Sequence, residues 1–168
     1  MIVVSNSSPI MNLAAVGQLD LLRTLYGRLI IPQAVYEEIA IAGKGRPGAN
    51  DVEVADWIEA RAPANRSVVT ALLSELDRGE AEVLALAVEI SAALVLLDER
   101  LARRVAARFG LRFVGLLGVL IEAKAKGLLL QIRPILDQLI SQAGFWIDPQ
   151  LYADVLRAAG ETTAPFIR

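Results

Sequence analysis

The sequence contains no cysteine and no histidine. Without cysteine the chain cannot form disulfides or thiolate metal sites, and without histidine it lacks the commonest general base and the commonest zinc ligand. Any catalytic chemistry must therefore be carried by carboxylates, amides, hydroxyls, lysine or arginine.

Long hydrophobic runs are also missing, although 55% of the residues are hydrophobic and the mean hydropathy is +0.48. No apolar stretch approaches the ~18 residues of a membrane span, and the first residues, MIVVSNSS, do not resemble a signal peptide. We therefore expect a cytoplasmic protein that does not bind membranes. Surplus apolar surface on one domain of 168 residues is typically covered by a second copy or a partner chain, so we predict an oligomer, most simply a homodimer.

Charge is unevenly distributed along a chain whose net charge is −2. Residues 100–133 contain eight basic side chains and one acidic side chain, Glu122. The net charge alone does not indicate a polyanionic partner, but this local basic segment is compatible with one.

Short apolar runs that alternate with helical patterns predict an α/β fold, with a parallel central sheet of four or five strands and helices on both faces. The strands are expected at Met1–Ser5, Leu29–Ile31, Ala92–Leu97 and Arg112–Val114. Residues 66–69 are predicted as a further short strand or a loop, and residues 51–61 as a helix. From Gly115 onward the pattern is helical.

Polar residues follow two of the predicted strands. Asn6 follows the first strand, and Asp98 follows the strand at residues 92–97. Open parallel sheets bind ligands at the carboxyl ends of their strands, so these side chains lie at one edge if the two strands are neighbours. Asp98 also has a purely structural interpretation, as the N-cap of the following helix. In that helix Leu101, Val105 and Phe109 are expected to face the core.

Two further carboxylates, Glu80 and Glu38, lie in predicted helices. Glu80 is three residues after Asp77, a capping-box spacing that also accounts for it structurally, and the neighbouring Glu82 is expected to be solvated. At 100° per residue Glu38 falls on the apolar side of its helix, where a carboxylate is costly to bury without a partner or a metal. Ser8, which precedes a proline, is predicted to be an N-cap.

Three carboxylates and one amide are thus expected where strands end or helices begin: Glu38, Glu80, Asp98 and Asn6. A few oxygen donors, with water completing the shell, are the ligands that Mg²⁺ and Mn²⁺ prefer. We predict that these four residues form a site for one or two such cations.

Four segments in this order, VVSNSSP, LIIPQAVYEEI, GEAEVLALA and LLDERLARRVA, resemble PIN domains, in the branch close to the VapC-type toxin nucleases. The resemblance covers residues 2–126, and the later sequence LDQLISQAGFWIDPQLYADVLRAAGE resembles additional helices of a toxin-like subgroup. It implies a doubly wound α/β/α nuclease core over residues 1–126, a helical extension of the same domain over residues 127–160 and a tail over residues 161–168.

The same resemblance implies a function. PIN domains are typically metal-dependent ribonucleases that hydrolyse RNA phosphodiester bonds, and many are toxins that pair with an antitoxin protein. Their acidic positions correspond here to Asn6, Glu38, Glu80 and Asp98, as catalytic residues and ligands of Mg²⁺ or Mn²⁺. Glu99 matches an additional acidic position, and Ser8 matches the small hydroxyl residue that follows the first acid.

The chain departs from the family at Asn6, where PIN domains usually have aspartate. Asparagine keeps a carbonyl oxygen but carries no charge, which predicts weaker metal binding and a slow or inactive enzyme. An inactive module that binds RNA or an antitoxin is therefore the alternative to an active ribonuclease. A receiver-type phosphotransfer domain fits less well because the first strand ends in SNSS rather than in an acidic pair, and a dinucleotide-binding fold lacks its glycine-rich turn.

RNA contacts are predicted for the helix after Asp98. Its arginines recur at spacings of three or four and share one side of the helix, where they can follow a phosphate backbone: Arg100, Arg103, Arg104 and Arg108. A solvated face or an oligomer contact explains the same stripe equally well. Tyr36, Trp57 and Trp146 could stack on bases, but packing in the core is the favoured interpretation for each.

Overall fold

The computed structural model describes residues 1–162 and contains a five-stranded parallel sheet in the order β3-β2-β1-β4-β5. The strands are β1 (Val3–Ser5), β2 (Leu29–Pro32), β3 (Ile58–Arg61), β4 (Leu94–Leu96) and β5 (Phe113–Val114). The predicted α/β fold with a parallel sheet is confirmed, and all four predicted strands are present.

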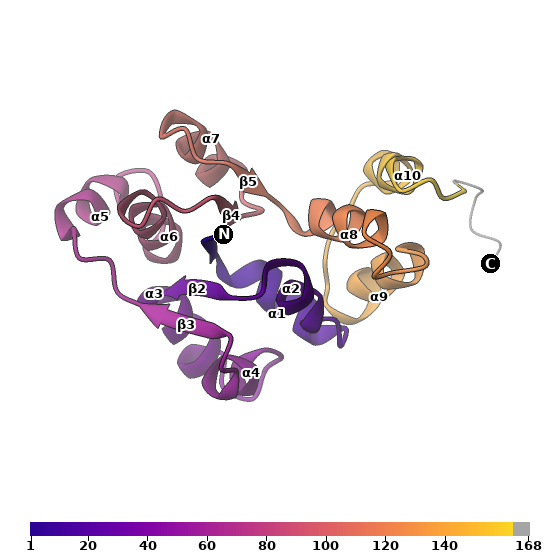
Figure 1. Cartoon of the computed structure of the whole chain (residues 1–168), viewed down its shortest axis with the longest axis horizontal. Helices are drawn as coiled ribbons and strands as arrows, with labels where there is room; N and C mark the ends of the chain where they lie inside the picture. Colours follow the sequence, from indigo (N-terminus) through magenta and orange to yellow (C-terminus); the bar gives the residue numbers. More distant parts are fainter. Residues whose placement is uncertain (163–168) are drawn as a thin grey trace.

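Helices cover both faces of the sheet (Figure 1). One layer contains α1 (Ser7–Ala15), α2 (Asp20–Tyr26), α3 (Gln33–Tyr36), the π-helix η1 (Glu37–Ala42) and α4 (Ala49–Val54). The other contains α5 (Arg66–Leu72), α6 (Arg78–Glu89) and α7 (Arg100–Arg108). Right-handed crossovers produce this arrangement, because the chain runs from β1 through β2 to β3 and then returns past β1 to β4 and β5.

The structure differs from the prediction on either side of β3. The helix predicted over residues 51–61 ends at Val54, and its second half forms β3 instead. This strand lies at the edge of the sheet and exposes two of its four residues, so it lacks the apolar run that marks a central strand. Residues 66–69 are neither strand nor loop but the start of α5, where the Asn65 side chain accepts a hydrogen bond from the Val68 N–H.

Helix α7 is rotated relative to the prediction. Of the three residues expected to face the core, Val105 is buried, but Leu101 and Phe109 are exposed. Ala102 and Ala106 are buried beside Val105. Small side chains allow the helix to pack closely, so here alanine rather than the larger apolar residues marks the buried side.

Three helices gather at one end of the molecule (Figure 1): α8 (Leu116–Ala125), α9 (Arg133–Gln142) and α10 (Pro149–Ala158). Helix α9 contacts α1, and α10 contacts α8, so the C-terminal helices pack on the sheet domain and on one another. The helical pattern predicted from Gly115 onward is confirmed for the described residues. None of the helices within residues 1–162 is long and apolar enough to cross a membrane, and residues 163–168 of the predicted tail lie outside the described residues.

Glu161 connects these helices. Its carboxylate accepts hydrogen bonds from the backbone N–H groups of Ile132 (2.8 Å) and Arg133 (3.2 Å) and from Lys124 Nζ (2.9 Å). The start of α9 has no side-chain cap of its own, so Glu161 satisfies N–H groups that the helix leaves unpaired. Burial alone would raise the pKa of Glu161, but these three donors together lower it.

Glu161→Gln should lower the free energy of unfolding by about 1 to 2 kcal/mol, since a charged acceptor is lost from a mostly buried site. The melting temperature should fall by about 3 to 6 °C. The pKa of Glu161 is lower in the folded state than in the unfolded state, where it is close to 4.5. The charged carboxylate therefore stabilises the folded protein fully above the unfolded pKa, and this stabilisation is lost as the pH falls through the folded pKa. Thermal melts of the two proteins should therefore differ most near neutral pH and converge in acid; a constant difference would contradict the assignment.

Candidate active site

The strand order reverses direction between β1 and β4, which places a crevice at their carboxyl ends. Ser5 pairs with Leu96 across these strands, and the Asn6 N–H donates to the Leu96 carbonyl at 3.0 Å. The sequence prediction required these strands to be neighbours, and they are. Asn6 and the Asp98 backbone therefore lie at the same edge of the sheet.

Asn6 occupies the N-cap position of α1, but its side chain makes no capping hydrogen bond. Asparagine is among the best N-cap residues, so an Asn that does not cap is free for another role. Its Oδ1 points toward Gly79, near the start of α6. A Cβ atom on Gly79 would lie 3.8 Å from Asn6 Oδ1, 3.4 Å from Glu38 Oε2 and 3.6 Å from Asp77 Oδ1. Two side-chain oxygens from distant segments, those of Asn6 and Glu38, thus lie at van der Waals distance from this position, next to the N-cap oxygen of Asp77.

Glu38 is exposed rather than on the core side of its helix, which corrects the prediction. The helical turn that carries it is a π-helix, so the rotation of 100° per residue does not apply from Glu37 to Ala42, and Ile39 and Ala40 are the buried residues. π-Helical turns occur frequently at functional sites. Here the turn directs Glu38 to the edge of the sheet.

Ser7, not Ser8, is the hydroxyl residue that contacts the acidic side chains. Ser7 is buried and its hydroxyl donates to Glu38 Oε2 at 2.7 Å. Ser8 instead accepts a hydrogen bond from Asn12 Nδ2 within α1. It is not the N-cap, because α1 begins at Ser7.

Glu80 forms the predicted capping box with Asp77. Its backbone N–H donates to Asp77 Oδ1 at 2.8 Å, and its Oε2 accepts from the Asp77 N–H at 3.1 Å. Burial raises the pKa of Glu80, and the negative charges of Asp77, Glu99 and Glu38 raise it further, against the effect of the Asp77 hydrogen bond. Glu99 therefore belongs to the same electrostatic neighbourhood, and a cation placed there would relieve the repulsion.

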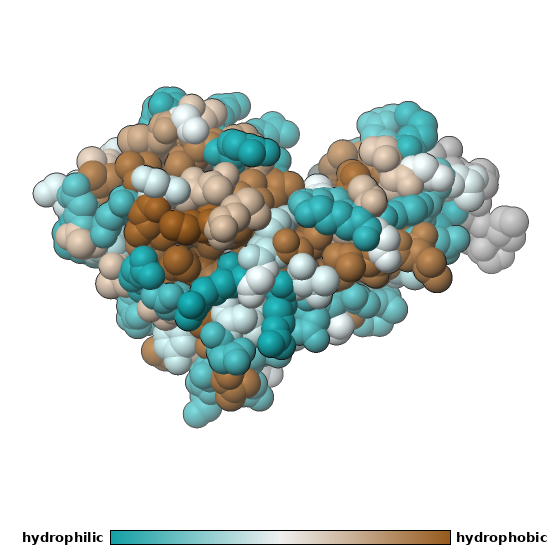
Figure 2. Space-filling model, in the orientation of Figure 1, coloured by the Kyte–Doolittle hydropathy of each residue, from teal (hydrophilic) through white to brown (hydrophobic). Residues whose placement is uncertain are grey.

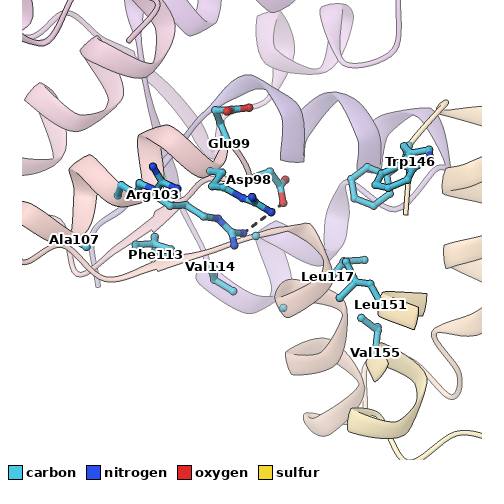
Figure 3. Close-up of a pocket in the computed structure, with 15 residues that line it drawn as sticks. Asp98, Glu99, Arg103, Ala107, Phe113, Val114, Leu117, Trp146, Leu151 and Val155 are labelled. Carbon is cyan, nitrogen blue, oxygen red and sulfur yellow. Dashed lines mark ion pairs between the residues drawn. The ribbon is translucent and has the colours of Figure 1, made fainter. Parts of the chain in front are cut away.

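Asp98 does not cap α7, which begins after Glu99. Instead, Asp98 Oδ1 accepts the Leu116 N–H (3.0 Å) at the start of α8 and lies 3.7 Å from Arg103 Nη2 (Figure 3). Its other oxygen, Oδ2, is buried and has no hydrogen-bond partner within residues 1–162. Burial raises the pKa of Asp98, while the Leu116 hydrogen bond and the Arg103 charge oppose this effect.

A cleft of about 1050 Å³ begins at Asp98 and Glu99 and runs between α7 and the C-terminal helices. Three of the four predicted RNA-binding arginines line it: Arg100, Arg103 and Arg104. Arg103 Nε donates to the Leu97 carbonyl at 2.7 Å, and its guanidinium lies 5.5 Å from the centre of the Phe113 ring. The fourth arginine, Arg108, does not line the cleft and pairs with Glu75.

A family model described as a PIN domain matches residues 2–161, which is nearly the whole chain. The chain belongs to the PIN-domain family. No curated protein gives a significant match to it. The matched range of the PIN domain includes the five strands and also the three C-terminal helices.

The chemistry of this PIN domain's donors suits a hard cation, although the described side chains do not enclose one. Within residues 1–162 no group of three acidic side chains is arranged to hold a metal ion. Glu80 and Asp98 each have one carboxylate oxygen bound at a helix N-terminus, which leaves Glu80 Oε1 and the buried Asp98 Oδ2 without a hydrogen bond in that range. These two oxygens, together with those of Asn6 and Glu38, are the donors that the PIN domain offers.

Two residues of this PIN domain have environments that differ from the sequence prediction. Glu82, predicted to be solvated, is only 1% exposed; it accepts the Ala34 N–H and pairs with Arg66 and Arg78. The signal in the sequence that Glu82 is buried was its position among the apolar residues of α6. Trp146, for which core packing was favoured, is 81% exposed and lines the cleft.

Proposed function

We propose that the protein is a metal-dependent ribonuclease that hydrolyses phosphodiester bonds in RNA. The observation that carries the proposal is the approach of the Asn6 and Glu38 oxygens to Gly79, beside Asp77 and Glu80, at the strand edge from which a cleft lined by arginines begins. Membership of the PIN-domain family gives this arrangement a nuclease-type fold. The absence of histidine is no obstacle, because carboxylate-bound cations can supply the chemistry.

In this proposal Glu38, Glu80 and Asp98 would hold Mg²⁺ or Mn²⁺, and Asn6 would contribute its uncharged oxygen. Because the three carboxylates are not arranged around one point within residues 1–162, they would have to move together when the ion binds. A bound cation of this kind supplies Lewis acidity and lowers the pKa of the attacking water. Ser7 fixes the Glu38 carboxylate through its hydrogen bond. Glu99 adds negative charge at the start of α7.

The arginines of the cleft bind the substrate. Arg100 and Arg104 line it and form no ion pair within residues 1–162, so their charges are available to RNA phosphates. Arg103 is committed to Leu97 and Asp98, where it positions the carboxylate. Arg108 lies outside the cleft and pairs with Glu75 at the surface, so its contact with RNA stays a prediction.

A second candidate follows from Asn6. The uncharged side chain at the first acidic position favours a module that binds RNA without cutting it. Both candidates predict RNA binding, and only cleavage separates them.

The proposal extends to a role as the toxin of a toxin–antitoxin pair and to a homodimer. The resemblance to VapC-type nucleases supports the first. Hydrophobic side chains gathered around the N-terminus support the second (Figure 2), since Met1 and Ile2 are exposed there. Light scattering should give twice the chain mass of 18.1 kDa. A monomeric mass would contradict the homodimer.

Expression of the protein without an antitoxin should slow bacterial growth. Unimpaired growth would contradict the toxin role.

The decisive experiment is cleavage of end-labelled single-stranded RNAs with Mn²⁺, Mg²⁺ or EDTA. The wild type should cut with Mn²⁺ or Mg²⁺ and stop cutting in EDTA. Asp98→Asn, purified in parallel, controls for contaminating nuclease. Equal cutting by both proteins, or no cutting with either metal, would reject the enzyme and leave the binding module.

A further inference from the structure

We infer that the cleft binds an unpaired RNA nucleotide next to the cleavage site, with its base stacked on Trp146 and its phosphates on Arg100 and Arg104. This inference rests on the proposed RNA substrate and adds a subsite made by the C-terminal part of the chain. It assigns to Trp146 a role in substrate binding, as the residue on which an unpaired base stacks.

Trp146 is unusually placed for its size. It lies in the segment between α9 and α10 and is 81% exposed. The second tryptophan, Trp57, is half-buried and packs against the hydrophobic core. An indole left in solvent contributes nothing to the core, but a flat aromatic face is the element on which nucleobases stack.

The two walls of the cleft around Trp146 match the two chemical parts of a nucleotide, the base and the phosphate. Its apolar wall includes Leu117, Leu151 and Val155, and its opposite wall carries the arginines of α7. Figure 3 shows Trp146 across the cleft from Asp98 and Arg103, with Leu117, Leu151 and Val155 below the indole. A base fits the apolar side and its phosphates fit the arginines, because a nucleotide joins a planar apolar group to an anion.

The geometry selects an unpaired base. In a duplex the faces of each base are covered by neighbouring base pairs, so an indole can stack only on a base that is splayed out of a single strand. Every base has such a face, and the subsite therefore tolerates any sequence but favours purines, which offer the larger stacking area.

The position of the subsite ties it to the proposed reaction. Asp98 lines the same cleft as Trp146. RNA held by Trp146 and the arginines therefore places the neighbouring phosphate at the acidic edge of the sheet. The subsite thereby contributes to binding without contributing a group to bond cleavage.

Binding of a fluorescently labelled single-stranded oligonucleotide in EDTA tests the inference without cleavage. By anisotropy, Trp146→Ala should raise Kd by about 5- to 100-fold, whereas Trp146→Phe should stay closer to the wild type because it keeps an aromatic face. Trp57→Phe is the matched control and should leave Kd unchanged. A duplex of the same sequence should bind much more weakly and should not respond to Trp146→Ala.

The indole provides a second readout. In the Trp57→Phe protein all tryptophan fluorescence comes from Trp146, and it should be quenched by the oligonucleotide if the base stacks on it. Thermal melts of Trp146→Ala should match the wild type, because an exposed side chain is removed. Equal Kd values for wild type and Trp146→Ala, or unchanged fluorescence on RNA binding, would overturn the inference.

The two proposals fail separately. Metal-dependent cleavage with no effect of Trp146→Ala on Kd retains the ribonuclease and removes the subsite. Binding that depends on Trp146 without cleavage by any metal retains the subsite and removes the enzyme.

Discussion

Asp98→Asn should reduce the rate of metal-dependent RNA cleavage on the order of 100- to 1000-fold. The substitution keeps an oxygen that accepts the Leu116 N–H and removes the negative charge, together with its attraction to Arg103. It also replaces the buried Oδ2, an oxygen that has no hydrogen-bond partner within residues 1–162 and can ligate a cation, with an amide NH₂ group that cannot. The expected loss is therefore one of metal-assisted chemistry and not of folding.

Single-turnover cleavage rates at several Mn²⁺ concentrations measure this effect, and thermal melts without metal establish that the fold is intact. Asp137→Asn is the matched control. Asp137 is also partly buried, and its carboxylate accepts one hydrogen bond, which comes from the Tyr152 hydroxyl and not from a backbone N–H as at Asp98. It lies on α9, away from the sheet edge. Similar losses in both variants, or none in Asp98→Asn, would remove Asp98 from the active site.

Asn6→Asp should increase the cleavage rate at limiting metal by about 10- to 100-fold. A unit negative charge about 4 Å from a cation strengthens cation binding by roughly 1 kcal/mol in a water-like dielectric and by roughly 4 kcal/mol near a protein surface. Each 1.4 kcal/mol corresponds to about a tenfold change in metal affinity. Repulsion from Glu38 and Asp77, whose oxygens lie near Gly79 as that of Asn6 does, offsets part of this gain.

The same repulsion makes a second measurement possible. Without metal, Asn6→Asp should melt a few degrees below the wild type, and added Mn²⁺ should raise its melting temperature more than that of the wild type, because the ion binds the folded state. Asn12→Asp makes the same change farther along α1, beside Ser8, and should alter neither cleavage nor metal dependence. If Asn6→Asp cut no faster than the wild type at any metal concentration, the first acidic position would not limit this enzyme.

The sequence predicts the central strands well because both faces of a central parallel strand are buried, which leaves an unbroken apolar run at β1 and β4. It does not predict β3, an edge strand in which charged residues replace that run. The capping box of Asp77 and Glu80 is also predicted, since it depends on local spacing alone.

The candidate site is harder to predict, because its residues meet through tertiary structure. The π-helix at Glu37–Ala42 changes the rotation per residue, so the exposed position of Glu38 cannot be obtained from α-helical geometry. Asp98 reaches the N-terminus of α8, 18 residues later in the chain, which no local pattern indicates. The exposure of Trp146 is not evident from its neighbours either, since the adjacent Phe145 packs against the core.

The helices that begin at the carboxyl edge of the sheet include α1 after Asn6, α6 after Asp77, α7 after Glu99 and α8 after Gly115. Each helix N-terminus carries about half a positive charge from its aligned peptide dipoles. Four such ends amount to roughly two positive charges that do not appear in a count of side chains. The electrostatic potential at the acidic edge is therefore less negative than its carboxylates suggest, and an RNA phosphate can approach a chain whose net charge is −2.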